Sequence, residues 1–326
     1  MKKLINSAET VVGDALRGLA AAHPSLRIDH ERRLVLRAEP KDYGTVALVS
    51  GGGSGHEPLH SGYVGFGMLD AACPGEIFTS PAPQHWLDAA VAAERGAGVL
   101  LIVKNYAGDV MNAEIAAELA AERRLDLRTV IIADDVSLDP PVRRGTGTAL
   151  LVHRLVGAAA EQGHDLDELH ALAVRVAASG RSMGLALRPA TVPAAGNPTF
   201  ELGDDEIEWG VGIHGEPGRE RQPLGTAREL AGRLVDPILA DGLPSGPAIV
   251  LLSGLGSTPL IELYVMHAEI VALLAHAGVT VARALVGNHV TALDMAGCSL
   301  TVLPVDDELL SLWDSPVETP VLRWGR

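Results

Sequence analysis

Short apolar runs alternate with longer, alanine-rich amphipathic stretches along the whole chain. In the first half the apolar runs predict strands over residues 45–50, 99–103 and 129–133. The stretches with helical periodicity predict helices over residues 84–95, 110–124, 147–162 and 166–178. Near the amino terminus, Asn6-Ser-Ala-Glu9 resembles a capping box ahead of a helical apolar stripe. This alternation of strands and helices is typical of a layered α/β protein.

The second half repeats the alternation. It predicts strands over residues 248–253, 280–285 and 300–305, with helices over 223–239 and 259–277. Residues 179–203 carry many Gly, Pro and Thr residues without any period, so we interpret them as the passage between domains. The sequence therefore predicts two α/β domains, residues 1–183 and 184–326, each a mostly parallel or mixed sheet flanked by helices.

Composition narrows the class of protein. The chain has 326 residues, which suits two domains, and with 47% hydrophobic but only 3% aromatic residues its core must be mainly aliphatic. A net charge of −15 without a basic tract argues against nucleic-acid binding. No apolar run approaches the roughly 18 residues of a membrane span. Cys73 and Cys298 belong to no C-x-x-C pair, so we expect a reduced, cytoplasmic protein without a disulfide framework.

Three glycine-rich segments place polar side chains close to predicted strands. They are VSGGGSGHEP at 49–58, VKNYAGD at 103–109 and GIHGEPG at 212–218. Glycine permits positive φ and close approach of a ligand to the backbone. Because α/β proteins place their chemistry on loops at strand ends, we interpret these segments as one site, with the glycine run admitting a ligand.

One metal-binding motif and one nucleotide-binding motif are matched in part, but the surrounding sequence argues against both sites. His56-Glu-Pro-Leu-His60 matches H-E-x-x-H, but Pro58 between the histidines and the preceding Gly and Ser residues disfavour the helix that zinc binding needs. We therefore expect no metal site. The Gly51–Gly55 run lacks the Lys-Ser/Thr pair of a phosphate-binding P-loop, so a self-contained nucleotide site is not supported.

The remaining candidates leave alternatives open. Asp109 either caps the following helix or acts as a base, and Lys104 is either a site residue or a solvated lysine at a strand end. His214, flanked by glycines, has an unobstructed imidazole that can act as acid, base or nucleophile. Acidic residues at positions 204–208 would favour its protonation if they lay close to it.

The motifs taken together resemble the dihydroxyacetone-binding K subunit of dihydroxyacetone kinases. Besides the three segments above, the resemblance rests on PGEIFTSP at 74–81, GSTPLIELY at 256–264 and LDMAG at 293–297, and it runs from about residue 4 to residues 319–320. The resemblance implies that a nitrogen of His214 adds to the ketone carbonyl of dihydroxyacetone to give a covalent hemiaminal. A polyol without a carbonyl is then rejected. The remaining hydroxyl of the captured ketone is held in place for attack.

The same resemblance assigns further roles. It makes His56 and Asp109 the proton-transfer residues and gives the substrate site as Gly53, Ser54, Gly55, His56, Lys104 and Asp109. It implies no cofactor in this chain, with ADP or ATP and magnesium on a separate nucleotide-binding L-type subunit. That subunit is recharged through a phosphoenolpyruvate-dependent phosphocarrier chain, and the K subunit itself is expected to form a homodimer.

Two alternatives accompany this interpretation. One is a non-catalytic coactivator of a transcription regulator that senses dihydroxyacetone. The other is a kinase for a four-carbon ketose such as erythrulose, for which Trp209 and Ser253 are the sequence features that would reshape the pocket. The presence of His56, Lys104 and Asp109 together favours the enzyme.

Overall fold

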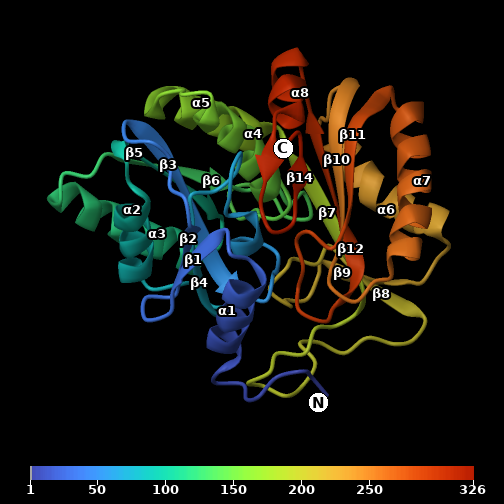
Figure 1. Cartoon of the computed structure of the whole chain (residues 1–326). Coiled ribbons are helices and arrows are strands. Elements are labelled where there is room, and N and C mark those ends of the chain that lie inside the picture. The colour runs from blue at the N-terminus through green and yellow to red at the C-terminus, as the bar shows by residue number, and fades with distance from the viewer. Residues whose placement is uncertain (1) are drawn as a thin grey trace.

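The computed structural model describes residues 2–326 and contains two six-stranded sheets with helices packed around them (Figure 1). The predicted α/β class, with two sheets flanked by helices, is confirmed. The first sheet has the order β1-β2-β4-β3-β5-β6, and the second has the order β11-β10-β12-β7-β8-β9.

The first sheet is parallel where it carries the site. Its strands are β1 (Leu26–Asp29), β2 (Leu34–Arg37), β3 (Thr45–Ser54), β4 (Ala71–Ile77), β5 (Gly96–Lys104) and β6 (Leu127–Ile132). Strand β3 pairs in parallel with both β4 and β5, and β5 pairs in parallel with β6. The carboxyl ends of β3 and β5 therefore meet at one edge of the sheet.

Helices cover both faces of this sheet. They are α2 (Pro83–Ala93) and α3 (Ala107–Glu122) on one face, and α4 (Thr148–Glu161) and α5 (Leu166–Ser179) on the other. Alternation along β3 follows this division, because Ala47 and Val49 pack toward α2 and α3 whereas Val46 and Leu48 pack toward α4 and α5. A short 3₁₀ turn, η1 (Ser61–Tyr63), follows β3, and α1 (Val11–Ala22) precedes β1.

The second sheet is mostly antiparallel. Its strands are β7 (Arg181–Arg188), β8 (Glu206–Trp209), β9 (Glu220–Pro223), β10 (Gly246–Gly254), β11 (Val279–Gly287) and β12 (Ala296–Pro304), and only β10 and β11 pair in parallel. Helices α6 (Ala227–Ala240) and α7 (Leu260–His276) cover its outer face. The chain ends with α8 (Asp307–Asp314) and the hairpin β13 (Val317–Glu318) and β14 (Arg323–Trp324).

Helix α4 lies between the two sheets. Nearly all of its residues are buried, and Leu150, Leu151 and Leu155 share one core with Ile249, Leu251 and Leu303 of the second sheet. A helix whose residues are buried on all sides must be enclosed by other elements. The packing of α4 therefore fixes the two halves of the molecule against each other.

Two predictions about local structure are wrong. Residues 181–188, predicted as part of an aperiodic passage, form the buried strand β7, because the short apolar run from Met183 to Leu187 completes the second sheet. Helix α1 begins at Val11 with Thr10 as its N-cap, so Asn6-Ser-Ala-Glu9 does not form the predicted capping box. The division into domains at residues 183 and 184 stays a prediction, and β7 spans that position.

No helix within residues 2–326 combines the length and the apolar character needed to cross a membrane.

Candidate active site

The three glycine-rich segments meet in space. His56 follows β3, Lys104 ends β5, Asp109 lies in the first turn of α3, and His214 lies in the loop between β8 and β9. The first three side chains are buried and His214 is partly exposed. The first sheet thus supplies a histidine, a lysine and an aspartate, while the second sheet supplies a histidine from the opposite side.

The glycine run is part of strand β3 rather than a loop after it. A Cβ on Gly51 would lie 2.5 Å from Cys73 Sγ, and one on Gly53 would lie 2.6 Å from the backbone nitrogen of Thr79. A Cβ on Gly52 would lie 2.6 Å from Lys104 Nζ. These positions require glycine mainly because neighbouring protein atoms leave no room for a Cβ. Gly52 provides the space that the lysine head occupies.

The two site histidines contact each other directly. His56 Nδ1 lies 2.8 Å from the carbonyl oxygen of Thr291, which can only accept, so Nδ1 carries the proton of the neutral ring. His56 Nε2 therefore accepts, and the His214 Nε2 that lies 3.1 Å away donates to it. The other nitrogen of His214, Nδ1, has no hydrogen-bond partner in the part of the chain that the structure describes.

Burial keeps this imidazole pair neutral. It lowers the pKa of both His56 and His214 well below the ordinary histidine value, and the charge of Lys104 adds to the effect. Acidic residues at 204–208 would favour protonation of His214 only if they lay close to it, and none of them is among the groups that shift its pKa. Glu208, for example, accepts from the backbone N–H of Gly218 at 2.9 Å and pairs with Arg221. A neutral imidazole has a lone pair with which to attack a carbonyl carbon.

Lys104 is wholly buried, so its interpretation as a solvated lysine is wrong. Its Nζ lies 4.0 Å from Asp109 Oδ2 and 3.2 Å from His60 Nε2. His60 Nδ1 in turn lies 2.9 Å from Ser50 Oγ, which donates to the carbonyl oxygen of Ile102 at 2.6 Å. This chain of donors fixes the tautomer of His60 and directs its lone pair at the ammonium group.

Asp109 does not cap helix α3. The N-cap is Tyr106, and neither carboxylate oxygen of Asp109 has a hydrogen-bond partner among residues 2–326. Burial raises the pKa of Asp109, while Lys104 opposes that rise. The carboxylate is therefore buried, close to a cation and available to accept a proton from a ligand.

The other predicted substrate residues line the same region but are partly engaged. The Ser54 hydroxyl donates to the carbonyl oxygen of Gly75 at 2.7 Å, and the Gly55 N–H donates to Glu57 at 2.9 Å. Gly53 and Gly55 both lie against Phe78. A small cavity of about 10 Å³ borders Gly52, Gly53 and His60.

Sequence reasoning missed two aromatic residues of the site and the role of His60. The Tyr106 ring centroid lies 3.9 Å from that of His214 in an edge-on arrangement, and the Phe78 ring stacks on His56 at 5.2 Å. Tyr106 belongs to the motif KNYAGD and Phe78 to PGEIFTSP. Both motifs support the family resemblance, so the sequence contained a signal for these two residues. In the sequence, His60 is notable only as the second histidine of the H-E-x-x-H match.

Residues 2–326 contain no group of three or more His, Cys, Asp or Glu side chains that could hold a metal ion. Cys73 and Cys298 are both buried and free.

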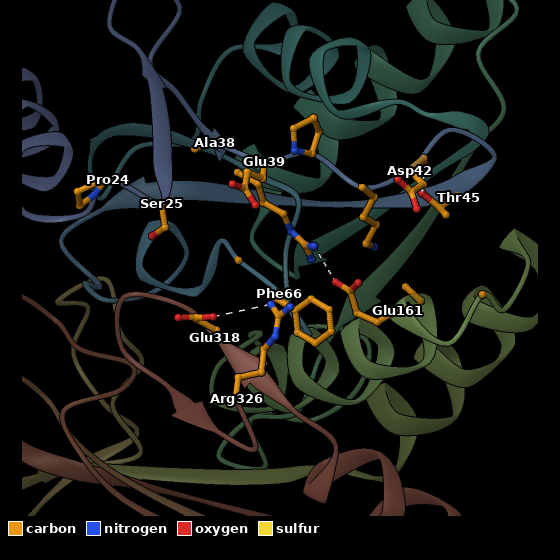
Figure 2. Close-up of a pocket in the computed structure, with 16 residues that line it drawn as sticks. Pro24, Ser25, Ala38, Glu39, Asp42, Thr45, Phe66, Glu161, Glu318 and Arg326 are labelled. Carbon is orange, nitrogen blue, oxygen red and sulfur yellow. Dashed lines mark hydrogen bonds and ion pairs between the residues drawn. The ribbon is translucent and has the colours of Figure 1, made fainter.

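A larger cavity, of about 520 Å³, lies away from these histidines, beside β2 and the end of α4 (Figure 2). Its cations are already paired. Arg37 contacts Glu161 at 2.6 Å, Lys41 contacts Asp70 at 2.9 Å, and Arg326 lies over the Phe66 ring. The cations of this cavity are therefore engaged within the protein, while the carboxylates of Glu39 and Asp42 also line it.

Comparison with known proteins now identifies the family. The Dak1 domain model matches residues 17–321. The chain belongs to the Dak1 domain family. It is 45% identical to the Escherichia coli protein "PEP-dependent dihydroxyacetone kinase, dihydroxyacetone-binding subunit DhaK", with all of both chains covered. It is 43% identical to the "L-erythrulose 1-kinase" of Mycolicibacterium smegmatis, of which the match covers 58%.

Two solved structures superpose closely on this chain. The dihydroxyacetone kinase of C. freundii superposes with a TM-score of 0.90 at 34% identity, covering 98% of this chain and 60% of that one. The dihydroxyacetone kinase operon co-activator DhaQ also gives 0.90 at 34% identity, covering 94% of this chain and 96% of the other. The predicted resemblance to the dihydroxyacetone-binding K subunits is thus confirmed.

Within this Dak1 fold, the two residues proposed to reshape the pocket lie elsewhere. The Trp209 side chain packs toward α6 and donates its indole N–H to the carbonyl oxygen of Arg233 at 2.9 Å. Ser253 Oγ accepts from the backbone N–H groups of His289 and Val290 and lies in the buried end of β10. The positions of these two side chains therefore give no indication of a pocket for a four-carbon substrate.

The buried histidines predict a specific acid sensitivity. Burial lowers the pKa of His153 to about 3, and both of its ring nitrogens lack partners among the residues described. The unfolded chain takes up a proton near pH 6.5 that the folded chain refuses, so stability is complete above that pH and declines as the pH falls. We expect His153→Leu to reduce the slope of unfolding free energy against pH by about 1.4 kcal/mol per pH unit between roughly pH 6 and pH 4.

Urea denaturation at a series of pH values measures this slope. His30→Leu, which changes an exposed loop histidine, is the matched control and should keep the slope of the unmodified protein. Equal slopes for all three proteins would contradict the prediction.

Proposed function

We propose that this chain captures dihydroxyacetone as a hemiaminal on His214 and presents the free hydroxyl for phosphorylation to dihydroxyacetone phosphate. The observation that carries the proposal is the neutral His214 imidazole, held 3.1 Å from His56 and within the electrostatic reach of buried Lys104, which lies 4.0 Å from Asp109. A nucleophile, a proton relay and a base thus lie within one enclosed site.

Capture is a simple addition in this geometry. The lone pair of a His214 ring nitrogen forms a bond to the ketone carbon, and the π pair of the carbonyl moves to its oxygen. The proton that the imidazole loses ends on that oxygen, so the step neither gains nor loses a proton overall. His56 Nε2, which accepts from His214, is in position to relay this proton.

Transfer of the phosphoryl group needs a base for the attacking hydroxyl. The proposal assigns this role to Asp109, with the support that it is buried and that both carboxylate oxygens lack a partner within the described chain. Burial raises its pKa and so makes it a stronger base than an exposed carboxylate. The Lys104 ammonium keeps it ionised.

The phosphoryl donor lies on another chain in this proposal. ADP or ATP with magnesium is held by a nucleotide-binding L-type subunit, which a phosphoenolpyruvate-dependent phosphocarrier chain recharges. The support is the name of the E. coli relative, a subunit of a PEP-dependent kinase that matches this chain over its full length.

Replacing His214 and Asp109 should separate capture from transfer. We expect His214→Ala to lose covalent capture, and Asp109→Asn to keep capture but slow phosphorylation by about 10²–10⁴-fold, because it lacks the base. Carbon NMR of ¹³C-labelled dihydroxyacetone reports capture. Phosphorus NMR with the partner subunit and each phosphoryl donor reports transfer. Normal turnover by Asp109→Asn would show that this carboxylate is not the base.

The two alternatives are separated by the same assay. The kinase and the co-activator superpose equally well, so the fold does not distinguish them, whereas the presence of His56, Lys104 and Asp109 favours catalysis. We expect phosphorylation of dihydroxyacetone at a higher kcat/KM than erythrulose, since neither Trp209 nor Ser253 faces the site. A preference for erythrulose would assign a four-carbon substrate. Capture without transfer to either ketose would favour the sensor.

We further propose that two copies associate through α7 and β11. The outer surface of α7 exposes Leu260, Ile261, Tyr264 and Val265, and Ile261 is 74% exposed. The neighbouring β11 is a nine-residue edge strand that pairs only with β10 among residues 2–326. A second copy related by a twofold axis would pair β11 with itself and cover the apolar face of α7.

Light scattering coupled to size exclusion measures this association. Ile261→Glu should halve the observed mass, because it places a charge in the covered face. Val174→Glu, an exposed valine on α5, is the control and should leave the mass unchanged. A dimeric Ile261→Glu variant would rule out this face.

A further inference from the structure

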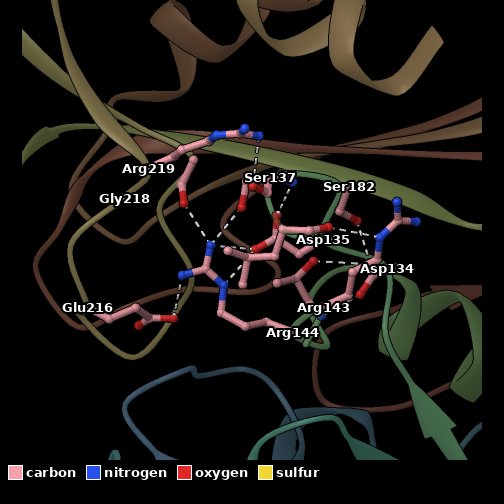
Figure 3. A network of polar contacts seen from close by, with 12 residues as sticks. Asp134, Asp135, Ser137, Arg143, Arg144, Ser182, Glu216, Gly218 and Arg219 are labelled. Carbon is pink, nitrogen blue, oxygen red and sulfur yellow. Dashed lines mark hydrogen bonds and ion pairs between the residues drawn. The ribbon is translucent and has the colours of Figure 1, made fainter. Parts of the chain in front are cut away.

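Arg144 lies between the two halves of the molecule, beside the loop that carries His214 (Figure 3). It comes from the segment after β6, and its side chain is only 11% exposed. Its guanidinium donates through Nε to Asp135 at 2.7 Å and through Nη2 to Ser137 at 2.9 Å. These two contacts anchor Arg144 to its own segment in the first half.

The remaining contacts of Arg144 cross to the histidine loop. Nη2 donates to the carbonyl oxygen of Gly210 at 2.7 Å, and Nη1 donates to Glu216 Oε1 at 3.0 Å. The second oxygen of Glu216 accepts the backbone N–H of His214 at 2.8 Å. One carboxylate thus joins the Arg144 side chain to the backbone of the nucleophilic residue.

The sequence of the loop fits this arrangement. A Cβ on Gly212 would overlap Glu216 Oε1, and a Cβ on Gly210, which has a φ of +77°, would lie 2.9 Å from the Ser137 side chain. These glycines therefore leave room for the Arg144 and Glu216 contacts. The motif GIHGEPG supplies the nucleophile, the carboxylate that holds it and the space that both need.

We propose that Arg144 and Glu216 are positioning residues that hold the His214 imidazole against His56. The proposal rests on the proposed function, because it assigns these residues to the capture step. The Arg144 fork reaches Asp135 on one side and Glu216 on the other. A flexible lysine ammonium cannot reproduce that planar geometry. Since His56 belongs to the first half and His214 to the second, this link sets the separation of the two rings.

Arg143 provides a matched control. It is the neighbouring residue, and it also makes a two-pronged ion pair, to both carboxylate oxygens of Asp241 at 3.0 and 2.5 Å. It is similarly buried, at 15% exposure, but its side chain contacts neither Glu216 nor the backbone at 210–214. A purely structural loss should therefore affect Arg143 and Arg144 variants alike.

The first measurement is capture of ¹³C-labelled dihydroxyacetone by the full chain, without partner subunits. Misplacement of a reacting group costs up to about a hundredfold, so we expect Arg144→Gln to weaken apparent affinity by about 10–100-fold. Arg144→Lys should be intermediate, and Glu216→Gln should be impaired like Arg144→Gln. Arg143→Gln should capture normally, while urea denaturation should show similar stability losses for the two glutamine variants.

The second measurement is ¹⁵N NMR of the histidine rings in the ketone-free protein, with the His214 signals assigned from His214→Ala. We expect Arg144→Gln to shift both His214 ring nitrogens, because the contact with His56 is lost, and Arg143→Gln to leave them in place. This readout needs no ligand. Failure of the unmodified protein to capture the ketone would thus overturn the proposed function without deciding the role of Arg144.

Two outcomes would overturn the positioning role. One is an unchanged His214 spectrum in Arg144→Gln. The other is equal loss of capture in Arg144→Gln and Arg143→Gln, in proportion to their loss of stability.

Discussion

The buried ammonium group of Lys104 is the charge on which the site depends. A cation without solvent must have close partners, and here they are the carboxylate of Asp109 and the lone pair of His60. The same charge, added to burial, holds His56 and His214 in their neutral form. Burial is the larger cause of that neutrality, and it also lowers the pKa of Lys104 itself, an effect that Asp109 and Glu57 oppose. Gly52 is required because any side chain there would displace the lysine head.

The second constraint is the relative placement of the two halves. Neither sheet alone holds a complete set of reactive groups, since His56, Lys104 and Asp109 belong to the first half and His214 to the second. The enclosed helix α4 fixes the halves through apolar packing. The hydrogen bonds of Arg144 to Asp135 and Glu216 link the halves again beside the loop that carries His214. Packing sets the overall distance, and directional hydrogen bonds set the orientation of one ring.

Two solved proteins with this fold have different functions. A kinase and an operon co-activator share this fold at the same TM-score, so the architecture serves both catalysis and sensing. Function then depends on which side chains stand at the strand ends. In this chain Asp109, Lys104 and both histidines are all present, which supports the proposal of a kinase subunit over that of a sensor.

The sequence by itself determined the α/β class, most of the elements and the residues of the site. Strand ends and glycine motifs are local signals, which is why Lys104, Asp109 and His214 are candidates from the sequence, whereas the role of His56 comes from the family resemblance. Only the tertiary structure decided their states, because desolvation depends on what packs around a group and not on its neighbours in sequence. It showed that Lys104 is buried, that Asp109 does not cap α3, and that burial lowers the pKa of His214 despite the acidic residues near it in sequence. The contact from Arg144 to Glu216 spans 72 positions, so no local pattern contained it.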